Sequence, residues 1–275
     1  PGGFSEGSFF TARMAELFPA LRRAGDPGQA WCQALARSAP PGAHFAFISA
    51  PGYLQDHQVV AYLATGLRER GISSWIGKPE QLDWQQGEAF WLPARDRQPL
   101  AAIIRFYQAE WLAELPARSA WQHLLRGGRT LVANPIQALI SESKRFPVLW
   151  DQLTTSLATW RALLPESRDP RGFNGASREW LLKQAYSNNG DAVILPENEP
   201  DWRWARLKAR LRPNTWVAQR RFESLPFPTP IGPRHACVGV YTVNGQATGA
   251  YVRLSSDPVV DYRAIDAALL LMNDD

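Results

Sequence analysis

The residues whose types and spacing best suit chemistry lie near the carboxyl-terminal end of the chain. Trp216–Gln219 is a short apolar run that ends in a glutamine, where a chain leaving a sheet offers backbone N–H and C=O groups to a ligand. Two β-branched and aromatic runs, 240–243 and 247–254, flank Asn244-Gly245, a pair that suits the positive φ angles of a tight hairpin turn. Arg253 stands at the end of the second run, and its planar guanidinium can hold negative charge. This order of strand, connector, hairpin and cation predicts a nucleotide-binding site.

The layout resembles the carboxyl-terminal part of the glutathionylspermidine synthetase-like, circularly permuted ATP-grasp ligases. In that family a strand ending in glutamine precedes a leucine-proline turn, a glycine-led strand, a short turn and a strand that ends in arginine. The matching elements here are Gln219, Leu225-Pro226, Gly239–Val243, Asn244-Gly245 and Gly249–Arg253. Four upstream blocks follow the order of the family: IIRFYQAEWL at 103–112, NPIQALISESKRFPVLW at 134–150, LLP at 163–165 and WLLKQAYSNNGDAV at 180–193. The resemblance covers most of the chain from about Phe45 onward.

The resemblance implies an ATP-dependent carboxylate–amine ligase that forms an amide bond through an acyl-phosphate intermediate. Its cofactors would be ATP and Mg²⁺, and its partners a small-molecule carboxylate and a small-molecule amine. Transfer of the γ-phosphoryl group to a carboxylate needs positioning and charge neutralisation more than covalent help. A second interpretation stays open, in which the chain is a catalytically inactive ATP-grasp-like module that binds a nucleotide or a partner.

The resemblance assigns the nucleotide phosphates to Lys144 and Lys183, because a lysine ammonium is a compact point charge. The alternatives are a lysine on a helix surface and a lysine at a strand end. Gly190 lies in a loop that would present backbone N–H groups to the phosphates, although Asn-Gly alone is typical of a hairpin turn. The loop reads Asn188-Asn189-Gly190 where the family has Arg-Glu-Gly, which weakens any transfer of that synthetase's substrate to this chain.

Gln219 and the backbone from Arg220 to Phe222 would hold the adenine between apolar walls, or else form an ordinary buried strand end. Arg253 is assigned a catalytic role, facing the γ-phosphate or the acyl phosphate, with a surface salt bridge as the alternative. We therefore expect the cations at 144, 183 and 253 to converge on one cleft.

No metal ligand is assigned within the chain. The histidines and cysteines have no metal-ligand spacing among themselves. In the resembled family, acidic and amide magnesium ligands lie in a segment just before a proline. The chain opens on Pro1-Gly2-Gly3-Phe4 without a methionine, so we expect it to continue from an upstream part that carries the Mg²⁺ ligands.

Composition limits which binding partners and which cellular compartment are expected for the protein. The net charge is +4 and the pI is about 9.3, but the densest basic run, 203–212, is broken by Trp204 and Leu207 in the manner of an amphipathic surface helix. This pattern favours a solvated helix face over a nucleic-acid site. Two cysteines build no disulfide framework, no apolar run is long enough to span a bilayer, and no cleavable signal is visible. We expect a cytoplasmic protein without a membrane partner, and the sequence gives no indication of its oligomeric state.

The pattern along the chain predicts an α/β fold, of the α+β kind in its second half. The expected order is an N-terminal helical segment at 1–40, a Rossmann-like (pre-ATP-grasp) subdomain at 41–133 and an ATP-grasp-like nucleotide-binding domain at 134–275. A strand at 44–49, a helix at about 56–70 and a strand at 72–76 form a βαβ unit, which indicates a parallel sheet. No dinucleotide glycine fingerprint follows these strands, so NAD is not expected.

The second half is expected to begin with two helices, at 136–149 and 151–164, with Pro147 marking a kink or boundary. Strands dominate from Trp180 onward, apart from a helix at 202–211 and a closing helix at about 262–272. The tryptophans, Trp150 and Trp160 among them, are expected to serve core and subdomain packing rather than to form a base-stacking surface.

Overall fold

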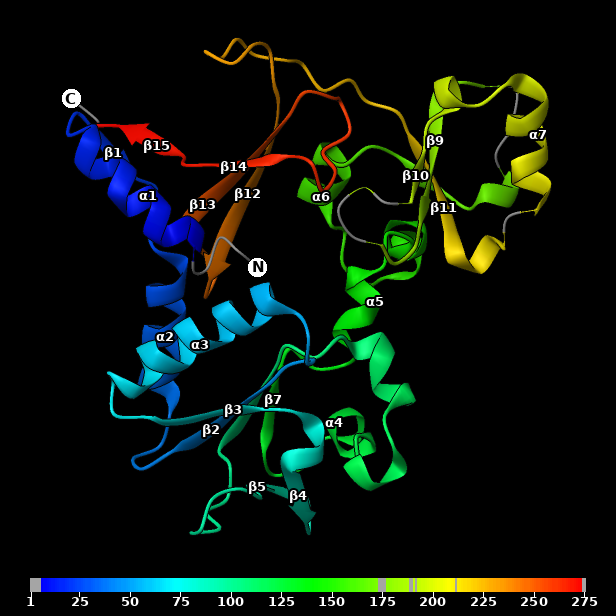
Figure 1. Ribbon diagram of the computed structural model, residues 1–275. Coiled ribbons are helices and arrows are strands. Elements are labelled where there is room, and N and C mark those ends of the chain that lie inside the picture. The colour runs from blue at the N-terminus through cyan, green and yellow to red at the C-terminus, as the bar shows by residue number, and fades with distance from the viewer. Residues whose placement is uncertain (1–5, 173–176, 188–189, 191, 211, 274–275) are drawn as a thin grey trace. The chain divides into compact units, whose positions relative to one another are not determined.

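The computed structural model describes residues 6–172, 177–187, 190, 192–210 and 212–273 (Figure 1). The chain forms two compact units. The first, here called the parallel-sheet unit, comprises residues 1–137, 238–253 and 266–275. The second, the antiparallel-sheet unit, comprises residues 138–237 and 254–265.

The parallel-sheet unit is built on a four-stranded sheet with the order β3-β2-β6-β7. Its strands are β2 (His44–Ile48), β3 (Ser73–Gly77), β6 (Ala102–Arg105) and β7 (Leu131–Ala133). Each pair of neighbours runs parallel, and α3 (Leu54–Arg68) connects β2 to β3. The predicted βαβ unit and its parallel sheet are therefore confirmed.

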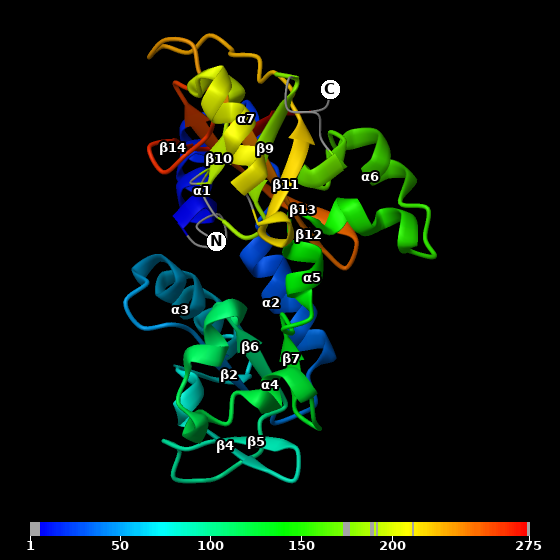
Figure 2. The ribbon, with the colours of Figure 1, turned by 90° about the vertical axis from the view of Figure 1, so that its right-hand side faces the viewer.

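Two helices cover this sheet and form its core. α2 (Pro27–Ser38) and α3 lie side by side in Figures 1 and 2. α2 begins where the Asp26 carboxylate accepts the backbone N–H of Gln29 at 3.0 Å, with a proline at the first helical position. The buried core residues are Cys32, Ala43, Phe45, Phe47, Val59, Val60, Leu63, Ala64, Leu67, Ile72, Ala102 and Ile104. These side chains come from both helices and from the strands, so the core fixes the sheet and the ends of its strands.

Smaller elements complete the parallel-sheet unit. They are α1 (Glu6–Leu17), β1 (Leu21–Arg23), β4 (Leu82–Gln85), β5 (Glu88–Trp91), α4 (Gln122–Arg126) and β15 (Leu270–Met272). β4 and β5 form an antiparallel hairpin, and β1 pairs with β15 in antiparallel register. Both cysteines are free: Cys32 is buried and Cys237 is exposed.

The predicted closing helix at 262–272 is wrong. The segment instead forms β14 (Ile265–Ala267) and β15, and β15 pairs with β1 so that Arg23 faces Leu270 and Leu21 faces Met272. Backbone hydrogen bonds to an edge strand far away in the sequence outweigh the local apolar pattern, which does not separate a short helix from a short strand.

The predicted hairpin is confirmed. β12 (His235–Val243) and β13 (Gln246–Ser255) flank a turn in which Asn244 has φ 50° and Gly245 has φ 78°. Both angles are positive, as a two-residue turn with the twist of a hairpin requires. β12, β13 and β14 lie in this order in one three-stranded sheet.

The antiparallel-sheet unit contains a four-stranded sheet with the order β10-β9-β11-β8. Its strands are β8 (Ser167–Arg168), β9 (Trp180–Gln184), β10 (Val193–Ile194) and β11 (Trp216–Arg220). α7 (Asp201–Arg210) covers one face, as Figure 2 shows, and its Trp204 is 2% exposed. Trp204 packs against Trp180, Leu182 and Ala218, which together form the core of this unit.

The two predicted helices at 136–149 and 151–164 are wrong in extent. The structure has α5 (Ala138–Glu142), a 3₁₀ helix at Phe146–Gln152 and α6 (Ala158–Leu163). The backbone N–H of Lys144 donates to the carbonyl of Ala185 at 3.0 Å, beside the end of β9, instead of continuing α5. Pro147 then removes a donor from the next turn. A tertiary hydrogen bond and a proline therefore divide the segment into short helices.

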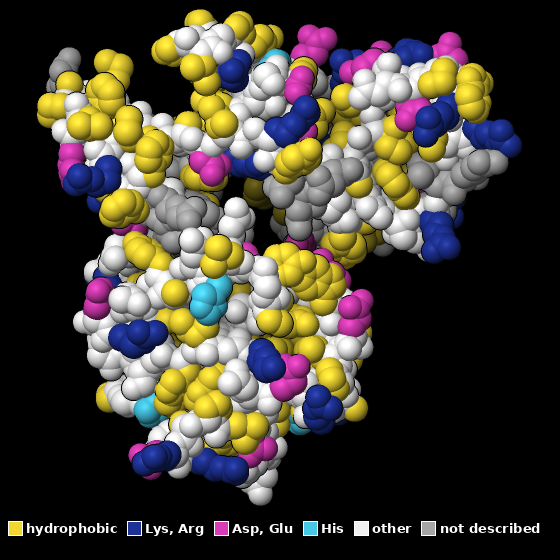
Figure 3. All heavy atoms as spheres, in the orientation of Figure 1, with side chains coloured by type: hydrophobic (Ala, Val, Ile, Leu, Met, Phe, Trp, Pro, Cys, Tyr) yellow, Lys and Arg dark blue, Asp and Glu magenta, His cyan; other side chains and the backbone are white. Residues whose placement is uncertain are grey.

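Two features of the described residues bear on partners. No helix among them combines the length and the apolar character needed to cross a membrane. On the face shown in Figure 3, Lys and Arg side chains are separated by acidic, polar and apolar groups and do not merge into one patch. The expectation that nucleic acid is not a partner stays a prediction.

We predict that Leu182→Ala destabilises the antiparallel-sheet unit by about 2–5 kcal/mol, because Leu182 is 0% exposed and its loss leaves a cavity beneath Trp204. Urea denaturation followed by tryptophan fluorescence measures the change. The matched control is Leu225→Ala, since Leu225 is 81% exposed and should change stability little. Equal effects of the two substitutions would contradict this assignment of the core.

Candidate functional site

The pleat of the antiparallel sheet selects which side chains face away from the core. Lys183 pairs with Val217 across β9 and β11, and Leu181 pairs with Gln219. Successive residues of a strand point to opposite faces, and Leu182 packs on Trp204 of α7. Lys183, Val217 and Gln219 therefore share the opposite face of the sheet.

The segment after α5 is held against the same sheet. The Lys144 N–H bonds to the Ala185 carbonyl at 3.0 Å. The guanidinium of Arg145 donates to the carbonyl oxygen of Trp216 and pairs with the Asp169 carboxylate at 3.0 Å. Both members of the ion pair are largely shielded, with 18% of the Arg145 and 24% of the Asp169 side chain exposed, so it is more than a loose surface contact. The two interactions fix the backbone from which the Lys144 side chain extends.

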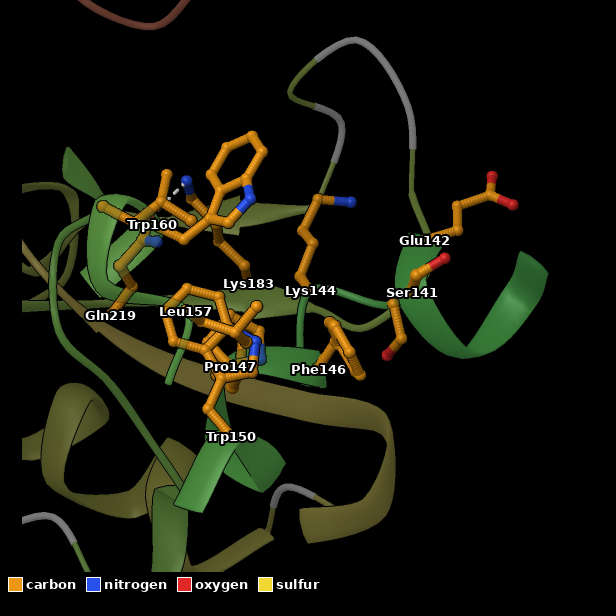
Figure 4. Close-up of a pocket in the computed structure, with 13 residues that line it drawn as sticks. Ser141, Glu142, Lys144, Phe146, Pro147, Trp150, Leu157, Trp160, Lys183 and Gln219 are labelled. Atoms are coloured by element: carbon orange, nitrogen blue, oxygen red, sulfur yellow. Dashed lines mark hydrogen bonds between the residues drawn. The ribbon is translucent and has the colours of Figure 1, made fainter. Parts of the chain in front are cut away.

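A cavity of about 460 Å³ lies between these elements of the antiparallel-sheet unit (Figure 4). Its lining residues are Ser141, Glu142, Ser143, Lys144, Phe146, Pro147, Trp150, Leu157, Trp160, Leu164, Lys183, Val217 and Gln219. The volume lies within the range of about 300–1,000 Å³ found for small-molecule sites. Most of the wall is apolar, and two lysines stand within it.

Both lysines are partly buried and bond to neutral acceptors. The Lys183 ammonium donates to Gln219 Oε1 at 2.7 Å, and the Lys144 ammonium donates to the carbonyl oxygen of Ser187 and to its hydroxyl at 3.2 Å. Burial lowers the pKa of Lys144, which Glu142 partly offsets. Burial also lowers the pKa of Lys183, and repulsion from Lys144 lowers it further.

The charge of this cavity is not balanced by the residues around it. In the part of the chain that the structure describes, neither ammonium forms an ion pair with a carboxylate, and Glu142 is the single acidic side chain among the lining residues. Two like charges that share a partly buried site disfavour each other's protonated form. A polyanion placed between them would relieve this repulsion, so the arrangement suits phosphate groups beside an apolar wall.

Three of the predicted site residues, Lys144, Lys183 and Gln219, line the cavity, whereas Arg220 and Phe222 are not among its lining residues. The Arg220 backbone N–H donates to the Glu166 carbonyl at 2.7 Å, and its guanidinium lies 5.0 Å from the centroid of the Trp180 ring. Phe222 is 59% exposed. In this state of the protein, the Arg220 N–H is thus engaged by the backbone next to β8.

Gly190 has a conformation that favours glycine. Its φ is 74°, and a Cβ there would lie 3.1 Å from Val259 Cγ1 and 3.2 Å from the Val260 carbonyl oxygen. A side chain at 190 would therefore be strained and crowded. Residues 188, 189 and 191 of the predicted phosphate loop lie outside the described residues, so the role of the loop stays a prediction.

Arg253 lies on β13 in the parallel-sheet unit, whereas the two lysines belong to the antiparallel-sheet unit. Its guanidinium is 3.7 Å from the Asp266 carboxylate of β14. Because Arg253 and the two lysines belong to different units, their expected convergence on one cleft stays a prediction.

The aromatic part of the cavity was not predicted from the sequence. Trp150 is buried, with 8% exposure, but Trp160 is 56% exposed and lines the cavity, so its expected packing in the core is wrong. Trp160 lies on α6, and Leu157 and Leu164, which flank this helix, line the same cavity. The single helix predicted at 151–164 did not indicate that these residues would face a cavity.

The described residues do not compose a magnesium site. No group of three or more His, Cys, Asp or Glu side chains among them could hold a metal ion. Glu142 alone supplies a carboxylate to the cavity wall, whereas Mg²⁺ takes several oxygen ligands.

A second cavity, of about 380 Å³, lies within the parallel-sheet unit. It is lined by Ser49, Ala50, Pro51, Gly52, Tyr53, Leu54, His57, Ile76, Gly77, Lys78 and Gln81. Ser49 follows β2, Lys78 follows β3, and Leu54 begins α3, so the cavity lies at the carboxyl ends of two parallel strands. Open α/β sheets bind their ligands in this position.

Fold and site together define an α/β protein of the pre-ATP-grasp and ATP-grasp-like class, as the sequence predicted. The family model described as glutathionylspermidine synthase preATP-grasp matches residues 28–267, and the chain belongs to this family. The resemblance noted from the sequence is therefore confirmed.

The chain is similar to solved structures of low sequence identity. A glutathione synthetase-like effector from Globodera pallida, in its apo form, matches with a TM-score of 0.57 and 10% identity, over 90% of this chain and 62% of that one. The chain thus spans 62% of the length of that protein. The ATP-grasp ligase PsnB, in complex with a minimal precursor, matches with a TM-score of 0.41 and 14% identity, over 78% of this chain and 76% of that one. No curated protein sequence matches this chain significantly.

We predict that Lys183→Met stabilises the ligand-free protein by about 0.5–2 kcal/mol, because it replaces a partly buried ammonium without a carboxylate partner by an apolar chain of similar length. Since the pKa of Lys183 is lowered on folding, the cost of burying its charge is complete below the folded pKa. The cost shrinks as the pH rises from the folded pKa toward the ordinary value of 10.5, where the unfolded chain also loses the proton.

Thermal unfolding at pH 7 and at pH 10 measures this gain, which should be smaller at the higher pH. Lys78→Met, at an exposed lysine of the other unit, is the matched control and should give little or no gain. A lower melting temperature for Lys183→Met than for the wild type would show that the Gln219 hydrogen bond outweighs the charge burial.

Proposed function

We propose that the protein is an ATP-dependent carboxylate–amine ligase of the ATP-grasp type. The observation that carries the proposal is the pair of partly buried lysines, Lys144 and Lys183, on the wall of one largely apolar cavity. Membership of the glutathionylspermidine synthase preATP-grasp family supports the same reading. Protein folds host many functions, so the site and not the fold bears the argument.

Phosphate binding at this cavity is an exchange of partners. Lys183 releases Gln219, Lys144 releases Ser187, and both ammonium groups then hold phosphate oxygens. Negative charge favours the protonated lysines, so the bound phosphates raise both pKa values toward and above their ordinary range. The apolar wall accommodates the rest of the nucleotide.

The proposed reaction has two steps. An oxygen of the substrate carboxylate attacks the γ-phosphorus of ATP. The bond from this phosphorus to the oxygen that bridges to the β-phosphate breaks, ADP departs, and an acyl phosphate remains. The amine nitrogen then attacks the acyl carbon, phosphate leaves, and the nitrogen gives up a proton to form the amide. The lysines neutralise the polyphosphate during the first step, and we assign Arg253 to the acyl phosphate. Mg²⁺ would supply further charge neutralisation when bound.

The second cavity supports a carboxylate substrate. Lys78 and His57 line it, and none of its described lining residues is acidic. Spermidine, named in the description of the family, is a polycation that acidic side chains would recognise. We therefore propose that this cavity takes a small carboxylate rather than a polyamine, consistent with the departure of the 188–190 loop from the Arg-Glu-Gly of the family.

The second candidate function is a nucleotide-binding module without turnover. Asn188-Asn189-Gly190 lacks the cation and the carboxylate that the family's loop supplies, and this observation favours the module. Both candidates require the lysine cavity to bind a nucleotide. They differ in whether ADP and an acylated product form.

Mg-ATP should raise the melting temperature of the protein, and Lys183→Ala should abolish the rise. At a hundredfold excess of ATP over Kd, binding adds about 2.7 kcal/mol to stability, which corresponds to roughly 5–10 °C. Lys78→Ala, in the other unit, should retain the rise and serves as the control. An unchanged melting curve of the wild type at millimolar ATP would argue strongly against a nucleotide site.

Turnover separates the two candidate functions. With Mg-ATP, a panel of small carboxylates and hydroxylamine as the amine, the ligase should release ADP and form an acyl hydroxamate in equal amounts. Arg253→Ala should reduce hydroxamate formation by about 10²-fold or more while leaving the ATP-induced melting shift intact. Nucleotide binding without hydroxamate from any carboxylate would favour the inactive module.

A further inference from the structure

We propose that Trp160 is the residue on which the nucleobase stacks, and that the face of α6 facing the cavity forms the base-binding wall of the lysine cavity. This inference rests on the proposed nucleotide site and names a binding residue within it. The observation behind it is an exposed tryptophan that lines a cavity together with two unneutralised ammonium groups.

α6 and the two residues that flank it present an apolar surface to the cavity. Trp160 lies on α6, Leu157 and Leu164 lie directly before and after the helix, and Trp160 and Leu164 keep 56% and 39% of their surface exposed. Exposed apolar surface of this size is costly in water, and a flat ring placed against the indole would cover it. Nucleobases of every type offer such a face.

Contacts elsewhere on α6 hold it in place without covering Trp160. The Arg161 guanidinium pairs with Asp151 at 2.9 Å, donates to the Ser156 carbonyl at 2.9 Å and lies 5.7 Å from the centroid of the Trp150 ring. Arginines cover the rings of Trp150 and Trp180. Within the described chain, the Trp160 indole has no aromatic or cationic partner of this kind.

The Trp160 indole and both ammonium groups line the same cavity. In Figure 4, Gln219 lies on one side of the Lys183 ammonium, and the Trp160 ring lies on the other side, toward Lys144. Gln219 Oε1 accepts the hydrogen bond of Lys183 in the ligand-free protein. When phosphate takes its place, the Gln219 amide, with one acceptor and one donor end, becomes available to the edge of the base. A base stacked on Trp160 thus keeps its phosphates within the cavity that both lysines line.

This arrangement predicts how affinity divides between the parts of the ligand. Stacking on an aromatic side chain contributes about 1–3 kcal/mol per base and tolerates different bases. Loss of the indole should therefore weaken nucleotide binding by about tenfold or more, because 1.4 kcal/mol corresponds to a factor of ten. Inorganic tripolyphosphate has no base, and its affinity should not depend on Trp160.

The test is isothermal titration calorimetry of the wild type, Trp160→Ala and Trp160→Phe with Mg-ATP and with Mg-tripolyphosphate. Trp160→Ala should bind ATP about tenfold more weakly or worse and tripolyphosphate unchanged, and Trp160→Phe should retain most of the ATP affinity. The matched control is Trp202→Ala, since Trp202 is 66% exposed on α7 of the same unit and is not a lining residue. It should bind both ligands as the wild type does.

Unchanged ATP affinity in Trp160→Ala overturns the stacking assignment while leaving the nucleotide site in place. An equal loss of ATP and tripolyphosphate affinity also overturns it, because such a loss reports damage to the phosphate site. A wild-type protein that binds neither ligand overturns the nucleotide site itself, and this inference with it.

Discussion

The candidate site depends on one constraint, the proximity of two ammonium groups that no described carboxylate neutralises. The alternation of β9 turns Lys183 away from the core, since Leu182 beside it is fully buried against α7. One backbone hydrogen bond, from Lys144 to Ala185, holds the second lysine to the same sheet. The core on one face of the sheet thus supports two partly buried charges on the other.

This arrangement places stability and function in opposition. A solvated pair of lysines would be tolerated easily, but these two are partly buried and have lowered pKa values. The Trp180, Leu182 and Trp204 cluster supplies the packing that offsets such a cost. Exposed apolar surface on α6 adds to the same pattern, because it too is unfavourable until something covers it. Groups that destabilise the ligand-free state are expected where a ligand completes the structure.

Regular local patterns were predictable from the sequence, and pairings between distant segments were not. The βαβ unit followed from apolar runs and their breakers, and the hairpin followed from Asn244-Gly245, because both depend on neighbouring residues. The helices expected at 136–164 failed because Lys144 bonds to Ala185, forty-one residues further along the chain. The closing helix failed because β15 pairs with β1. Lys144, Lys183 and Gln219 came from the family resemblance, whereas the exposed Trp160 required coordinates.

Each ammonium already has a neutral acceptor, and this has a consequence for ligand selection. Phosphate oxygens would replace Ser187 and Gln219 as the acceptors of the lysine N–H groups, so the number of hydrogen bonds changes little. What changes is the charge of the acceptor. The bonds to Ser187 and Gln219 already have an ionised donor, and a phosphate oxygen adds the attraction between opposite charges. In the proposed site, an uncharged molecule with the outline of a triphosphate would lack this attraction, so selection would depend on ionic character before shape.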